Sequence, residues 1–550
     1  MVSQSSDDAP TGPIRSQEPQ PRIIRSQTPE TGPETHTADP TGRRNIRSDL
    51  TAIALLVIAV FLPWNLYFGV GIPDSKPILF AVLLVVTLLS VLAVAVAGKS
   101  GRLRLWLNVP YLLLVLAFVG FDAFETVRFG GTVNVPGGVG PGAWVGVAGS
   151  LLSAQTAITG ARTGPVPEDD GHTGWRRSAR IIGYASMLAA ALSFGFNLYW
   201  RLRYALQSAG GAAGFGKQNI AVIATAVVYG VVAVVAVLAA SRWLSRNAKA
   251  FRLATVALGG STLIAGILVW SLPIGRDVDA FHGIAQNTST AGVGFEGYLA
   301  WAAAAAIFAP GVLFGHRNTS ATEENAWRVA ARNGLLLIAV WCVGSMAMRI
   351  TDLIVSVMLD YPFSRYDSLV LACFDLATAV LAIWLRARLA EHARSARLIS
   401  SVCGLVATLT VARVIVGVAL APRFAESPNS PALHPVYGND LAQQITSVFD
   451  VTLCGLGLSI FAAAIVTGHL TGRRLARRAA RRRAAEANAA APTTRIPVGQ
   501  AAAPSAAETT RIRTGPAQSG PSPRIFRGDD SATRQIPVSG KPQIFRPPQA

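Results

Sequence analysis

The chain has 550 residues, of which 51% are apolar and only 14% are charged, and its formal net charge is +19. A soluble globular chain carries about 25% charged residues, so this composition excludes an ordinary soluble protein and favours an all-α integral membrane protein. The arginines gather beside apolar stretches, which indicates anionic lipids as partners and excludes nucleic acid as the expected one.

The first 48 residues are polar and rich in Pro, Ser and Thr. Such a segment buries too little apolar surface to fold, so residues 1–48 are predicted to be a disordered tail. The tail also lacks the apolar stretch of a cleaved secretory signal. The first apolar helix is therefore expected to direct membrane insertion itself.

Apolar runs follow one another from about residue 49 to residue 470. A membrane span requires roughly 20 mainly apolar residues, and the runs predict about twelve transmembrane helices. The expected helices cover residues 51–71, 77–97, 105–125, 142–160, 179–200, 219–240, 252–273, 295–315, 333–357, 367–386, 398–420 and 443–468. The fourth helix, rich in Gly and Ser, and the twelfth, which contains Asp450, have the weakest signal.

Basic residues gather in every second loop, on one side of the predicted bundle. Arginine and lysine in short loops favour the cytoplasmic side. One loop on the opposite side, with Arg201, Arg203 and Lys217, departs from the pattern. The balance predicts a multi-pass protein of the plasma (inner) membrane with both termini in the cytoplasm. The first two basic groups are Arg43, Arg44 and Arg47, then Lys99, Arg102 and Arg104.

The helices fall into groups of four that resemble one another. The second and third groups open with Trp175 and Trp327, each followed by Arg, and Asn65 and Asn197 are each followed by Leu and Tyr. A long loop joins the third and fourth helix of every group. We therefore predict three tandem four-helix units, whereas chance alternation of loop lengths is the other interpretation. The units would cover residues 49–160, 175–316 and 327–470.

Ionisable residues inside the predicted spans are concentrated in the third unit. Such residues are costly in a bilayer and are therefore candidates for function. One interpretation is a set of ion pairs between helices. A second is a polar cavity that binds an ion or solute, with Asp375 or Asp450 carrying a proton. A third is a set of lipid-facing charges near helix ends that extend towards the headgroups. The candidate cluster is Arg349, Asp352, Asp375, Arg413 and Asp450.

The first two units are more neutral. In the first unit, Asp122 and Glu125 lie near the end of the third helix, and Gln155 lies in the fourth helix. The second unit has little beyond Asn197. We therefore expect the intramembrane chemistry to be concentrated in the third unit.

Residues 471–550 are predicted to form a basic stop segment followed by a disordered cytoplasmic tail. Seven arginines follow the last apolar helix without interleaved aromatic residues, which favours contact with anionic lipid over nucleic acid. They are Arg473, Arg474, Arg477, Arg478, Arg481, Arg482 and Arg483.

Three threonines of the C-terminal tail lie in similar surroundings. Thr493, Thr509 and Thr533 each have Ile three residues later. These windows resemble acceptor sites of actinobacterial membrane Ser/Thr kinases, and the phosphorylated form resembles a ligand of forkhead-associated domains. The resemblance implies phosphopeptide-binding partners. Apolar–Arg peptides such as Pro523–Arg527 and Pro542–Arg546 also recur, which is typical of docking motifs, although drift in low-complexity sequence is the other interpretation.

The whole chain offers no signature of an enzyme. It has no GxxxxGK phosphate loop, no HExxH or paired-cysteine metal motif and no GxSxG motif, so we expect no enzymatic activity, no metal and no cofactor. Arginine greatly exceeds lysine, and in this respect the chain resembles uncharacterised actinobacterial multi-pass membrane proteins. The leading hypothesis is a membrane anchor, or scaffold, whose tails recruit partners. The alternative is a secondary transporter or flippase that uses the third unit's charges.

Overall fold

The structure is a computed structural model that describes the helical body and a short stretch beyond it. The described residues are 46–65, 67–72, 75–96, 101–130, 138–155, 173–209, 215–271, 285–287, 290–313, 321–359, 365–390, 396–425, 448–465, 480–481 and 483–486. Most of the two tails predicted to be disordered lies outside these residues, but residues 46–48 belong to a helix and residues 480–481 and 483–486 are helical.

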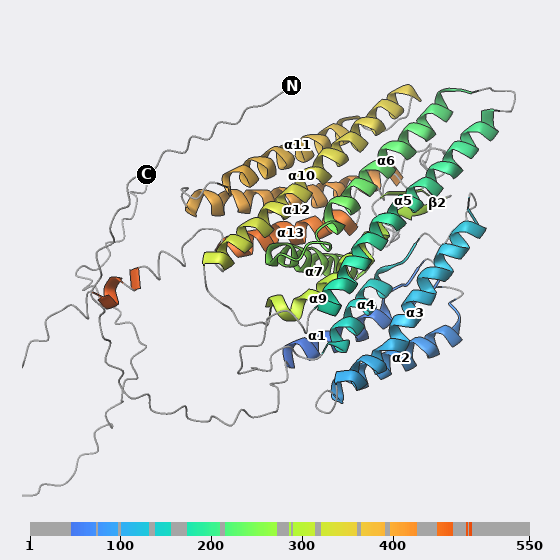
Figure 1. Cartoon of the computed structure of the whole chain (residues 1–550). Helices are drawn as coiled ribbons and strands as arrows, with labels where there is room; N and C mark the ends of the chain where they lie inside the picture. The colour runs from blue at the N-terminus through green and yellow to red at the C-terminus, as the bar shows by residue number, and fades with distance from the viewer. Residues whose placement is uncertain are drawn as a thin grey trace, which may run out of the picture. The chain divides into compact units, whose positions relative to one another are not determined.

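The described part of the body is almost entirely helical (Figure 1). Ten of its helices are long and apolar enough to cross a membrane, as an all-α membrane protein requires. The helices are α1 (Ile46–Phe61), α2 (Pro77–Ala95), α3 (Gly101–Arg128), α4 (Pro141–Ala154), α5 (Thr173–Ala209), α6 (Lys217–Ser241), α7 (Lys249–Ser271), α9 (Phe295–Leu313), α10 (Ala321–Met358), α11 (Arg365–Arg388), α12 (Ala396–Ala425) and α13 (Val448–Ile465).

The side chains of α2 differ in polarity between its outer face and the face that packs against other helices. Proline occupies the start of this helix, where its missing N–H costs nothing. Leu88 is 66% exposed, whereas Ser90 is completely buried. Apolar residues therefore face outwards and small polar residues face the other helices, which is the pattern of a bundle surrounded by lipid.

Two of the twelve expected spans, 51–71 and 142–160, are shorter in the structure than the apolar sequence. Helix α1 ends at Phe61, two residues before Pro63, and residues 62–65 continue as buried non-helical backbone. The backbone N–H of Gly140 donates a hydrogen bond to the Trp64 carbonyl at 2.6 Å, which ties this segment to the start of α4. Non-helical backbone is tolerated at membrane depth only where protein covers it. Helix α4 has 14 residues, all buried.

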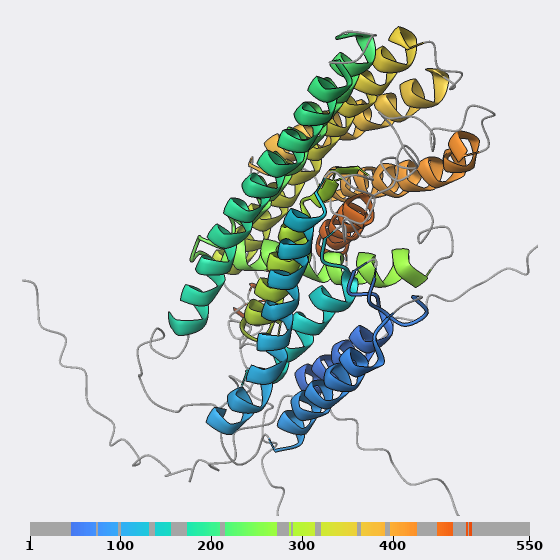
Figure 2. The same cartoon turned by 90° about the vertical axis from the view of Figure 1, so that its right-hand side faces the viewer.

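The last helix of each predicted unit lies towards the interior. Helix α4 packs against α1, α3 and α9, while α9 and α13 both pack against α7. In Figures 1 and 2, α7 lies between the blue first-unit helices and the orange and red C-terminal helices. The candidate charges and the central aromatic residues are therefore surrounded by helices.

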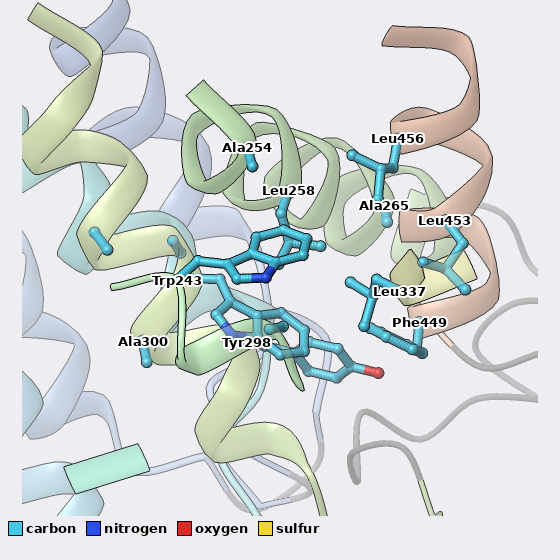
Figure 3. Packing of buried hydrophobic residues seen from close by; sticks show 14 of the residues in the cluster. Trp243, Ala254, Leu258, Ala265, Tyr298, Ala300, Leu337, Phe449, Leu453 and Leu456 are labelled. Atoms are coloured by element: carbon cyan, nitrogen blue, oxygen red, sulfur yellow. The ribbon is translucent and has the colours of Figure 1, made fainter. Parts of the chain in front are cut away.

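Aromatic rings fill this interior. Tyr298 of α9 lies 4.8 Å from Trp144 of α4 and 6.4 Å from Phe449 of α13, measured between ring centroids. Phe449 in turn lies 4.9 Å from Trp341 of α10. Figure 3 shows Phe449 beside Leu337, with the Tyr298 ring extending towards them. These contacts join helices from all three predicted units into one aromatic core.

A short hairpin precedes α9 where the sequence suggested only a loop. Strands β1 (Ala285–Asn287) and β2 (Thr290–Val293) pair antiparallel, and Gly294 follows them with a φ of 113°. This left-handed conformation favours glycine. The hairpin and Gly294 lead directly into the first turn of α9.

Candidate functional site

Arg413 connects three helices of the third unit. Its guanidinium group, on α12, forms ion pairs with Asp375 of α11 and Asp450 of α13. The side chain of Arg413 is 6% exposed, and those of Asp375 and Asp450 are 0% and 1% exposed. The structure thus brings together three of the five candidate residues in a buried triad.

Neutral partners from α10 complete this triad. Arg413 donates a hydrogen bond to Ser345 Oγ at 2.7 Å. Trp341 Nε1 donates a hydrogen bond to Asp450 Oδ1 at 2.5 Å. Since all four helices of the third unit contribute a group, the arrangement holds them together in the way expected of ion pairs between helices.

The remaining two candidates lie further along α10. Asp352 accepts a 2.5 Å hydrogen bond from Tyr229 of α6, so it connects the second unit to the third. Arg349 lies close enough to attract both Asp352 and Asp375 electrostatically. The five charges therefore form a largely compensated network, in which each acid has a cation or a hydroxyl donor nearby.

A second buried ion pair joins the beginnings of α1 and α3. Arg104 Nη2 lies 2.6 Å from Asp49 Oδ1, and both side chains are nearly inaccessible to solvent. Arg104 Nε also donates to the backbone carbonyl of Ser153 at the end of α4. The prediction that Arg104 lies in a basic loop was wrong, because α3 starts at Gly101 and turns this side chain into the bundle.

Asp122 lies near the opposite end of α3. It is 2% exposed and accepts a 3.4 Å hydrogen bond from Asn65, in the non-helical segment after α1. Asn65 Oδ1 also accepts a hydrogen bond from the backbone N–H of Tyr67. The break after α1 thus places a polar group against a buried carboxylate.

Glu296 lies in the first turn of α9 and is 7% exposed. Ser193 of α5 donates a hydrogen bond to its Oε1, and the backbone N–H of Gly294 donates one to its Oε2 at 2.9 Å. The hairpin and its left-handed glycine therefore fix this carboxylate inside the bundle. The expectation that the second unit holds little beyond Asn197 was wrong.

The negative charge of Glu296 acts electrostatically on Asp122, and these two carboxylates are here called the acid pair. Among the described residues, neither Asp122 nor Glu296 has an ion-pair partner. The acid pair therefore differs from the Arg413 triad, in which an arginine compensates the acids. Two buried carboxylates without a cation favour binding of a proton or a small cation.

Sequence patterns could have found part of this arrangement. Asp122 was noted near a helix end, but Glu296 sits at the boundary of an expected helix, where an acid usually stabilises the helix start. Only the fold reveals that its side chain points inwards. The pairing of Asp49 with Arg104, 55 residues apart, has no local signal at all.

Most of the tail candidates lie outside the described residues, including Thr493, Thr509 and Thr533. Arg481 and Arg483 are described, and both are exposed in helical backbone. The other five arginines of the stop segment lie outside. In the part of the chain that the structure describes, no group of three or more His, Cys, Asp or Glu side chains could hold a metal ion.

A comparison with family models matches residues 45–469 to a domain of unknown function, DUF7937. The chain belongs to the DUF7937 family. The match extends over the whole described bundle, so the buried clusters belong to a DUF7937 body rather than to the tails. No curated protein and no solved structure matches the chain. The suggested actinobacterial origin stays a prediction.

Proposed function

We propose that the helical body is a secondary transporter or flippase, and that the acid pair binds its coupling cation. The observation that carries this proposal is the acid pair itself: Asp122 and Glu296 are buried, the charge of one acts on the other, and neither has a cation among the described residues. A transporter coupled to a cation requires a site that gains and loses a positive charge within the membrane.

The position of the acid pair supports the same proposal. Asp122 belongs to the first predicted unit and Glu296 to the second, and Asn65 lies in a break between helical and non-helical backbone. Interrupted spans and contacts between repeats are where transporters often bind their ions. This moves the transporter hypothesis from the third unit's charges to the first and second units.

The decisive measurement is charge displacement in proteoliposomes that contain the full-length chain. Sodium jumps and pH jumps are applied separately, so that the response identifies the cation. We expect a transient current with one of them. The double variant Asp122→Asn, Glu296→Gln should lose it while keeping wild-type abundance and thermal stability, because both substitutions keep the side-chain shape.

Glu125→Gln is the matched control, since Glu125 lies on the same helix and pairs with Arg128 at 3.5 Å near the surface. This variant should keep the current. A wild-type protein that responds to neither jump, or a double variant with an unchanged current, would contradict the proposal.

A scaffold is the second candidate function, and the closed Arg413 triad favours it. A body held by compensated ion pairs suits a static anchor, and the recurring tail peptides suit recruitment of partners. In this proposal Thr493, Thr509 and Thr533 are phosphorylated and bind phosphopeptide-recognising proteins. Phosphopeptide mapping from growing cells that found all three threonines unmodified would remove the phosphorylation from this proposal.

The three-unit organisation and the membrane orientation are part of the proposal. Its support is that α4, α9 and α13, the last helices of the predicted units 49–160, 175–316 and 327–470, all lie in the interior. We place both termini in the cytoplasm and the chain in the plasma membrane. Accessibility labels near both ends should react only after the inner membrane is permeabilised; labelling of one end alone in intact cells would contradict this orientation.

A further inference from the structure

Helix α9 contains a proline close to its end. Pro310 has no backbone N–H, so it cannot donate the hydrogen bond that the carbonyl of Ala306, four residues earlier, would otherwise accept within the helix. Ala306 is buried, with an exposed fraction of 5%. A backbone carbonyl without a donor is costly at such a position, so another part of the chain has to supply the donor.

Gln155, at the end of α4, supplies it. The side-chain Nε2 of Gln155 donates a hydrogen bond to the Ala306 carbonyl at 3.0 Å, between residues 151 positions apart in the sequence. Gln155 is itself 5% exposed. A side chain from the first predicted unit therefore replaces the bond that Pro310 removes from the last helix of the second unit.

The two helix ends that meet here are held differently. The end of α4 is fixed on a second side, because Arg104 donates to the Ser153 carbonyl and also pairs with Asp49. In α9, Gly311 follows the proline, and a Cβ atom added there would meet nothing within 4 Å. Leu313 is 48% exposed. Helices bend at proline and glycine, so the end of α9 is the one that can move.

We propose that Gln155 and Pro310 form a latched hinge in α9. While the hydrogen bond from Gln155 holds, the end of α9 stays against α4. When the bond breaks, α9 bends after Ala306 and its last residues move away from α4. The hinge lies just before the connection to α10, where the second predicted unit joins the third. This inference concerns a movement of the body and does not depend on the transport proposal.

A permanent contact between α4 and α9 would use the same hydrogen bond, but it predicts a different response to substitution. Loss of a permanent contact loosens both helices, whereas loss of the latch loosens only the end of α9. Pro310→Ala gives the Ala306 carbonyl a donor within its own helix. The latch then becomes redundant, whereas a permanent contact keeps its contribution.

Hydrogen exchange of the full-length chain in detergent, followed by mass spectrometry, measures the movement. Gln155→Met keeps the length of the side chain and removes its donor. Exchange in residues 307–313 should become about twofold to tenfold faster, the range that one buried hydrogen bond sets for local opening. Exchange in residues 145–153 of α4 should stay unchanged. Gln207→Met, the same change at an exposed position of α5, is the matched control and should exchange like the wild type.

Pro310→Ala is the second variant, and it tests the hinge even if Gln155→Met unfolds. Exchange in residues 307–313 should fall below that of the wild type, because the alanine N–H closes the gap in α9. Adding Gln155→Met to this variant should then change nothing. Equal loosening of α4 and α9, unchanged exchange in either single variant, or an effect of Gln155→Met that persists beside Pro310→Ala would overturn the proposal.

Discussion

Arg413 places one positive charge between two carboxylates, Asp375 and Asp450, at a depth where solvent does not reach. Removing one partner of a buried ion pair leaves the other charge without compensation, which costs more than the pair contributes. Loss of Arg413 is therefore costly mainly because it would leave two buried carboxylates without a counter-charge. This asymmetry distinguishes a buried ion pair between helices from a surface ion pair.

We predict that Arg413→Met lowers the free energy of unfolding by about 3–5 kcal/mol, the range for breaking a buried pair. The measurement is thermal unfolding in detergent, together with abundance in membranes. Arg203→Met is the control, because Arg203 is exposed and stacks on Trp200. Adding Asp375→Asn and Asp450→Asn to the Arg413 variant should restore much of the loss. Equal stability of the two single variants would contradict the prediction.

The sequence shows which charged residues are rare in their surroundings, but it does not show which way their side chains point. Asp375, Arg413 and Asp450 stand out because charges are rare in apolar runs, and the structure brings these three together. Glu296 and Arg104 do not stand out, since each lies at a helix boundary where charged residues are common. Which way such a side chain points depends on packing between helices distant in sequence, and no local pattern encodes that.

At the scale of helices, α7 and α9 approach closely through a glycine. A Cβ atom added to Gly259 would lie 2.2 Å from the Trp301 carbonyl oxygen and 2.4 Å from Ala305 Cβ. The neighbouring Gly260 would meet nothing within 4 Å. Small residues let membrane helices approach each other closely, and here only one of two adjacent glycines has that role.

We predict that Gly259→Ala destabilises the body by about 1–3 kcal/mol, because backbone atoms of α9 cannot move aside as a flexible side chain can. Gly260→Ala should leave stability unchanged or slightly higher, since alanine favours helix. Unfolding followed by tryptophan fluorescence compares them directly. If both alanine variants unfold alike, the close approach of α7 to α9 is not as described.

Hydropathy identified the helices well and their ends less well. Ten expected spans correspond to membrane-length helices because length and apolar content suffice to recognise them. The end of α1 at Phe61 was missed, since the apolar sequence continues to residue 71 and buried coil is as apolar as helix. Pro63 was the available signal. The β1 and β2 strands have only three and four residues and no clear alternation.

At the scale of the molecule, the family match ends at residue 469, before the C-terminal tail. A chain that ends at Arg483 should therefore insert and unfold at the same temperature as the full chain, because the aromatic core and the ion pairs lie within residues 46–465. Thermal unfolding of the two detergent-purified proteins makes the comparison. Aggregation of the shortened chain would contradict this expectation.

The same shortened chain separates the two proposed functions. A transporter should retain its current in proteoliposomes, because the acid pair lies in the body. A scaffold should lose its partners, because they bind the tail. A retained current together with lost partners would mean that both functions are present, whereas a lost current in a stable body would contradict the placement of the cation site.

Helix α4 also constrains the order in which this protein can be made. At 14 residues, about 21 Å, it is too short to cross a bilayer alone, and part of its cover comes from α9, which the ribosome synthesises more than a hundred residues later. Until α9 is synthesised, α4 lies in the membrane without one of the helices that cover it. A nascent chain halted before Phe295 should accordingly be a preferred target of membrane quality-control proteases.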